Sequence, residues 1–83
     1  MQLRSESITW REIDGELVIL DTERSVYLTT NASGTHLAKL LTSERTADEL
    51  ADALVAQYGI DRETAVADVA AFVAQLQAKG LLR

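Results

Sequence analysis

The sequence has no cysteine and only one histidine among its 83 residues. Without cysteine there can be no disulfide, no thiolate metal site and no Cys nucleophile, and a reducing compartment is permitted. His36 has no second His at ligand spacing and lies outside any HExxH pattern, so we expect it at the surface. Acid–base catalysis and metal binding at neutral pH commonly use His and Cys side chains. The sequence therefore predicts a protein that is not an enzyme and holds no metal or cofactor.

Long apolar runs and an excess of positive charge are also missing. No run approaches the ~20 apolar residues that cross a bilayer, and the initial MQLRSESITWREI lacks the apolar core of a signal peptide. We therefore expect a cytoplasmic protein that does not contact a membrane. The formal net charge of −5 opposes binding to the phosphate backbone of nucleic acid and favours a basic or neutral partner.

What is present is the composition of one folded domain. Residues 1–83 are too few for two domains, and a 47% share of hydrophobic residues is ordinary for a chain that folds around a core. At this length the core must be packed efficiently, because a small domain hides only about 60% of the surface that its unfolded chain exposes. We expect stability to come from packing alone.

A β-hairpin is predicted near the start of the chain. Two β-rich runs within Ile8–Asp21 are joined by Asp14-Gly15, a dipeptide that suits a two-residue type I′ turn. That turn sets Trp10 opposite Ile19, so we expect Trp10 to pack on the core rather than to bind a ligand. The second run, Leu17–Leu20, is apolar on both faces, which predicts a central strand covered on both sides.

A third strand is predicted at Ser25–Thr29, SVYLT. Val26 and Leu28 should point to one face of the sheet and Tyr27 to the other, because side chains alternate along a strand. As the last strand of a meander it should have a free edge with unpaired backbone groups.

Helical periodicity replaces the strand pattern after residue 30, so the fold class is α+β. We expect helices that start at Thr30 or Asn31, at Thr46 and at Asp61. Gly59 should end the second helix, and the third should run to about Lys79. The third helix has an apolar arc of roughly 160°, wider than the ~100° that a surface helix needs. Either part of this arc faces another molecule, or the helix is central and packs against both the sheet and the other helices. The arc comprises Ala65, Val66, Val69, Ala70, Phe72, Val73 and Leu76.

The order DGELVILD, VYLTTNASGTHLAKLL, TADELADALVAQYG and LQAKGLL resembles a PqqD-like domain, also called a RiPP recognition element. Small stand-alone members of this family serve lasso-peptide biosynthesis. The resemblance covers about residues 8–82 and implies a winged-helix-like fold, with a three-stranded antiparallel sheet followed by three α-helices. It also implies that the leader segment of a precursor peptide docks as an extra antiparallel strand on the third strand, against the third helix. The implied peptide-binding residues are Ser25, Val26, Tyr27, Leu28, Thr29, Asp68, Val69, Phe72, Val73 and Leu76. Asp68 and Gln75 would flank Phe72 on the helix rim, where Asp68 either meets a basic residue of the peptide or is simply solvated.

The leading hypothesis is a non-catalytic adaptor that binds the leader of a ribosomally made precursor and presents it to a separate enzyme. In a lasso pathway the resemblance implies that this enzyme is a leader peptidase. One alternative is a PqqD-like chaperone for a radical enzyme in another peptide-modification pathway. The other is a winged-helix DNA-binding protein, but the third helix carries only Arg62 and Lys79 as basic residues, at its two ends.

Overall fold

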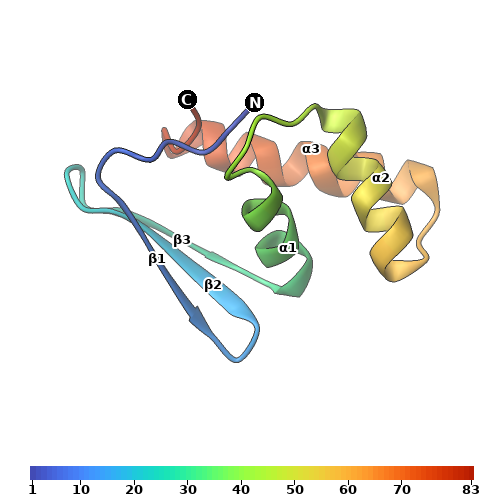
Figure 1. Cartoon of the computed structure of the whole chain (residues 1–83), viewed down its shortest axis with the longest axis horizontal. Helices are drawn as coiled ribbons and strands as arrows, with labels where there is room; N and C mark the ends of the chain where they lie inside the picture. The colour runs from blue at the N-terminus through green and yellow to red at the C-terminus, as the bar shows by residue number, and fades with distance from the viewer.

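Three strands come first along the chain and three helices follow (Figure 1), as expected for the α+β class. A computed structural model describes residues 1–83. The strands are β1 (Ile8–Ile13), β2 (Glu16–Asp21) and β3 (Val26–Thr30). The helices are α1 (Ala32–Leu40), α2 (Ala47–Tyr58) and α3 (Arg62–Ala78). No helix combines the length and the apolar character needed to cross a membrane.

The hairpin forms with the predicted turn and register. Asp14 and Gly15 have φ angles of 52° and 80°, the positive values that a type I′ turn requires at both central positions. Trp10 pairs with Ile19, and the Trp10 side chain is half-buried against the core. The sheet order is β1-β2-β3 with antiparallel pairing throughout, so β2 is central.

The prediction that both faces of β2 are covered is wrong. Leu17 and Ile19 are buried, but Leu20 on the opposite face is 39% exposed and Val18 is only half-buried. Antiparallel sheets tolerate one solvated face, and here the helices pack on the face that holds Ile19. The continuous apolar run of β2 therefore predicts correctly that the strand is central, but it does not show that both faces of the sheet are covered.

β3 is the edge strand that the sequence predicts, with its bounds displaced by one residue. Ser25 lies outside the strand because its φ of 58° belongs to the left-handed region, where it closes the preceding turn. The strand continues to Thr30, which pairs with Leu17. β3 pairs only with β2, so its other edge is free.

Local side-chain caps start the three helices at the expected residues. Asn31 accepts a hydrogen bond from the Gly34 N–H, and Thr46 forms a capping box with Glu49. Asp61 accepts from the Thr64 N–H, and this hydrogen bond holds the pKa of the Asp61 carboxyl below its usual range. Each cap satisfies backbone donors that the first helical turn leaves without partners.

The wide arc of α3 is divided between the core and the surface. Ala65, Val69, Phe72 and Leu76 are buried, whereas Val66 is 46% exposed. Val66, Ala70 and Val73 line a small apolar depression of about 150 Å³ that also contacts Met1 and Ala47. Only part of the arc therefore meets the sheet and the other helices.

The N-terminal and C-terminal segments pair with each other through backbone hydrogen bonds, a feature that the sequence pattern does not predict. Leu3 and Leu82 form an isolated antiparallel bridge, and the Arg4 N–H donates to the Leu81 carbonyl at 2.9 Å. Leu3 is 4% exposed and Leu81 is fully buried, so both ends contribute to the core. Figure 1 shows the two termini close together.

Candidate functional site

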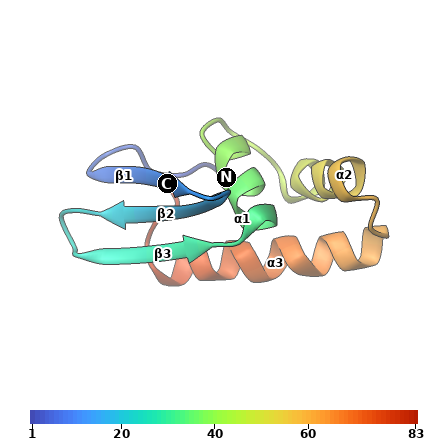
Figure 2. The same cartoon turned by 90° about the horizontal axis from the view of Figure 1, so that it is seen from below.

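The free edge of β3 lies beside α3 (Figure 2). A depression lies between this edge and α3. At the C-terminal end of β3 it has a volume of about 480 Å³ and is lined by Thr29 and Thr30, by the start of α1 and by the middle of α3. A second depression follows Ser25–Thr29 and reaches Lys79 at the end of α3. The two share Thr29, and we refer to them together as the β3–α3 groove.

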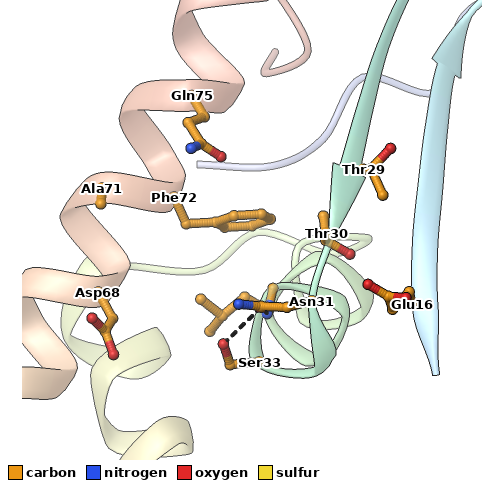
Figure 3. Close-up of a pocket in the computed structure, with 11 residues that line it drawn as sticks. Glu16, Thr29, Thr30, Asn31, Ser33, Asp68, Ala71, Phe72 and Gln75 are labelled. Atoms are coloured by element: carbon orange, nitrogen blue, oxygen red, sulfur yellow. Dashed lines mark hydrogen bonds between the residues drawn. The ribbon is translucent and has the colours of Figure 1, made fainter.

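The floor of the wider part of the groove is aromatic. The Phe72 ring points from α3 towards Thr30, as Figure 3 shows, and Phe72 is only 8% exposed. Gly34 permits this arrangement, since a Cβ at that position would lie 2.9 Å from the Thr30 Cβ and 3.3 Å from Cε1 of Phe72. The glycine thus lets α1 begin close to both β3 and the ring.

The Thr30 hydroxyl beside the ring is satisfied within the protein. The Thr30 hydroxyl lies 2.8 Å from the Thr35 hydroxyl and 3.3 Å from both the amide nitrogen and the carbonyl oxygen of Leu17. No buried side-chain nitrogen or oxygen lacks a hydrogen-bond partner. The floor therefore presents a preformed surface, and unpaired backbone groups lie along the β3 edge beside it.

All five of the predicted strand residues lie along the groove. Ser25, Val26, Tyr27, Leu28 and Thr29 line its narrower part. Leu28 is 7% exposed and Tyr27 is 62% exposed, in agreement with the predicted alternation of faces.

The predicted helix residues divide into two groups. Asp68 and Phe72 line the groove, but Val69 and Leu76 are 2% and 0% exposed and belong to the core. Val73 lies in the apolar depression on the other flank of α3. At about 100° per residue these three side chains are rotated away from the β3 edge relative to Phe72. The apolar stripe thus marks the inner face of α3, and the groove lies along the margin of that stripe.

Sequence reasoning missed several residues that line the groove. These include Ala71 on α3, Lys79 at the C-cap of α3, and Asn31 and Ser33 at the start of α1. Gln75 lines the groove on the helix rim, as expected. Positions 68, 72, 75 and 79 follow one another at spacings of three or four, which places them along one side of a helix. Because only one of these four residues is apolar, a search for hydrophobic periodicity does not detect this side of the helix.

The groove offers no obvious means of catalysis. No cluster of three or more His, Cys, Asp or Glu side chains is arranged to hold a metal ion. His36, expected at the surface, is instead half-buried, with its ring 6.4 Å from the Tyr58 ring in an edge-to-face contact. An unpaired strand edge beside an apolar floor is suited to binding an extended segment of chain.

Comparisons with known proteins identify a family and two solved structures that this chain resembles. The family model described as coenzyme PQQ synthesis protein D (PqqD) matches residues 16–82. A solved structure of TbiB1 in complex with the TbiA(beta) leader peptide is 31% identical, with a TM-score of 0.86, and the match covers 100% of this chain and 95% of that chain. A second structure, lasso peptide synthetase B1 complexed with the leader peptide, is 26% identical, with a TM-score of 0.81 and coverage of 96% and 93%. A search of curated proteins found no significant match. The family match over most of the chain, together with these two structures, shows that the protein belongs to the PqqD family, as a RiPP recognition element.

Proposed function

We propose that this protein is a non-catalytic adaptor that binds the leader segment of a ribosomally made precursor peptide by strand addition to β3. It then presents the precursor to a separate enzyme, which in a lasso-peptide pathway is a leader peptidase. The observation that carries this proposal is the free edge of β3 facing α3 across an open groove. Two proteins of the same fold are bound to leader peptides, which supports the same role for this groove.

Strand addition uses the two resources that the groove provides. Backbone groups along the β3 edge supply hydrogen bonds to any extended peptide, whatever its sequence. Alternate side chains of the added strand would point towards Phe72, where each buried apolar anchor contributes about 1.5–3 kcal/mol before ordering costs. A short segment with two or three anchors is therefore sufficient for useful affinity.

The structure changes which residues we propose for the site. The β3 edge, Ser25–Thr29, extends to Thr30, and the facing wall consists of Asp68, Ala71, Phe72, Gln75 and Lys79. Val69 and Leu76 support this wall from the core, and Val73 lies outside the groove.

Binding can be tested with the TbiA(beta) leader peptide, labelled with a fluorophore and titrated with the protein. We expect saturable binding, and several-fold weaker binding by Ala71→Gln, because a larger side chain then occupies the groove. Ala74→Gln is the matched control, since Ala74 is exposed and lies about 200° around α3 from Phe72. Equal affinity in both variants would place the peptide elsewhere. The absence of binding to the wild-type protein would contradict the proposed function.

A second titration tests the mode of binding. N-methylation removes a backbone N–H, so methylating successive residues of the leader should weaken binding at every other position, as antiparallel pairing requires. A uniform effect along the peptide, or none, would contradict strand addition.

Delivery to an enzyme needs its own assay. We expect the protein to accelerate cleavage of a full precursor by a lasso leader peptidase, and Ala71→Gln to reduce this acceleration. The description of the family as a PQQ synthesis protein favours a second candidate, delivery to a radical enzyme that modifies a different precursor. Acceleration of that modification, with no effect on peptidase cleavage, would select the second candidate.

A further inference from the structure

Two carboxylates lie at the end of the groove where β3 finishes. Asp68 on α3 and Glu16 at the start of β2 line the wider depression beside Thr30. Figure 3 shows them on opposite walls of it. Both residues are exposed, and neither takes part in an ion pair within the protein. This end of the groove therefore has negative charge available for a bound molecule.

One cation lies at the opposite end. Lys79 lines the narrower depression together with Ser25 and has no carboxylate partner within the protein. The nearby Arg4 is paired with the buried Asp21, whereas Arg24, with a side chain that is 60% exposed and 4.0 Å from Asp21, adds positive charge beside Gly80. Lys79 is the cation that lines the end of the groove where β3 begins.

The two charged ends are separated by the length of the strand. Asp68 and Lys79 are eleven positions apart on one side of α3, which corresponds to about 16 Å of helix. The first and last of the five residues of β3 are four positions apart, about 13 Å at about 3.3 Å per residue, a few Å less than the distance between the two charged positions. A segment of about five residues added to β3 would therefore have one end beside Asp68 and the other beside Lys79.

The direction of the added strand follows from the orientation of β3 and α3. β3 and α3 run antiparallel (Figure 2). The end of β3 lines the groove with Asp68 and Phe72, whereas its start lines the groove with Lys79. A peptide that pairs antiparallel with β3 therefore runs in the same direction as α3. Its N-terminal end lies at the acidic end of the groove and its C-terminal end at Lys79.

We propose that this charge polarity selects leader segments with a basic residue at the start of the docking strand and an acidic residue four positions later, on the same face of the strand. The inference rests on the proposed function and defines the class of leader that the groove accepts. A segment with the opposite order would bring like charges together at both ends. Charges at the rim of an interface act mainly on association rate, register and discrimination between partners. Backbone pairing binds an extended segment, and the terminal charges then determine its direction and register.

The test uses the TbiA(beta) leader with the docking strand located by the N-methylation scan. One probe carries Lys at the start and Glu at the end of that strand, and the other carries Glu and Lys in the reverse order. Since the two probes have identical composition and net charge, overall attraction to the acidic protein is the same for both. We expect the Lys-first probe to bind roughly tenfold more tightly at low salt, because two favourable pairs replace two repulsive ones. The difference should shrink at about 1 M salt, where exposed charges are screened.

The reciprocal change is made in the protein. Asp68→Lys combined with Lys79→Glu conserves net charge and should reverse the preference between the two probes. Glu6→Lys combined with Arg83→Glu is the matched control, since both residues are exposed and do not line the groove. Circular dichroism and Tm confirm that each variant is folded, and the control should keep the wild-type preference.

The outcomes separate this inference from the proposed function. Failure of the unmodified leader to bind would overturn both. Binding of the unmodified leader, with equal affinity for the two probes or with a preference that the Asp68 and Lys79 exchange does not change, would overturn the charge selection alone. Reversal by the exchange, and not by the control, would support it.

Discussion

Asp21 is the most constrained charged residue of the protein. It is 1% exposed and accepts hydrogen bonds from the Arg4 guanidinium at 2.5 Å and from the Glu23 and Arg24 N–H groups, both at 3.1 Å. Burial alone would raise the pKa of this carboxyl. The hydrogen bonds from Arg24, Arg4 and Glu23 outweigh burial and hold the pKa below its usual range. The charged form of Asp21 thus ties the loop between β2 and β3 to the N-terminal segment.

This residue predicts how stability depends on pH. Because the pKa of Asp21 is lower in the folded state, its contribution is present above the unfolded pKa, near 4, and is lost as pH falls through the folded value. We expect Asp21→Asn to lower Tm at pH 7 and to lose less of its Tm between about pH 5 and about pH 2 than the wild type. Asp14→Asn, in the exposed hairpin turn, should keep the wild-type acid profile. An unchanged profile in Asp21→Asn would contradict this role.

At the scale of elements, the approach of α1 to β3 and α3 depends on one position without a side chain. In most helices Gly→Ala gains about 1 kcal/mol from propensity. At Gly34 the new methyl group would meet the Thr30 Cβ at 2.9 Å, and that atom is attached directly to the backbone. Steric overlap should therefore outweigh the gain.

We accordingly expect Gly34→Ala to destabilise the protein by about 1–3 kcal/mol, as overpacking of a core does, and to weaken leader binding by displacing the Phe72 ring. Urea unfolding and the fluorescence titration measure the two effects. Gln77→Ala, at an exposed position of α3 outside the groove, should change each of them little. A more stable Gly34→Ala variant would show that α1 can move away from β3 without cost.

The elements were predictable where their cause is local. The Asp14-Gly15 turn, the Thr46 cap with Glu49, and Gly59 each act through neighbouring backbone groups, so the sequence pattern contains the whole cause. The faces of α3 were less predictable, because its rotation depends on how β3 and α1 pack against it. Val69 and Leu76 satisfy the same helical pattern as Phe72 and differ from it only in this rotation.

At the scale of the whole molecule, the paired N-terminal and C-terminal segments form part of the core. Leu3 is 4% exposed, and its N–H donates to the Leu41 carbonyl at 2.9 Å, so it connects the C-terminal bridge to the end of α1. No periodic pattern includes this residue, which explains why the sequence did not reveal its role.

We expect Leu3→Ala to cost about 2–5 kcal/mol of the free energy of unfolding, the range for a buried Leu→Ala change. That is a large share of the stability of an 83-residue domain. Urea denaturation measures the loss, and Gln2→Ala, which removes a single exposed side-chain hydrogen bond, is the control. Similar midpoints for the two variants would mean that the N-terminal segment is not coupled to the fold.

Ligand binding should also be visible in the stability of the whole molecule. A leader at about 100 times its Kd adds about 2.7 kcal/mol to the native state when it does not bind the unfolded chain. For a domain of this size we expect Tm to rise by about 10 °C or more. Ala71→Gln should show a smaller rise at the same peptide concentration and Ala74→Gln an unchanged one. No rise with a peptide that binds in titration would indicate that it binds the unfolded chain equally well.

The bridge between Leu3 and Leu82 has a consequence for engineering and for architecture. The two termini lie close together. The domain could therefore be inserted into a surface loop of a larger protein, with the two connecting segments side by side. Residues 1–4 and 81–83 do not line the β3–α3 groove. The same geometry permits a circular permutant, in which a short linker closes the old ends and new ends are opened in the turn at Asp14-Gly15.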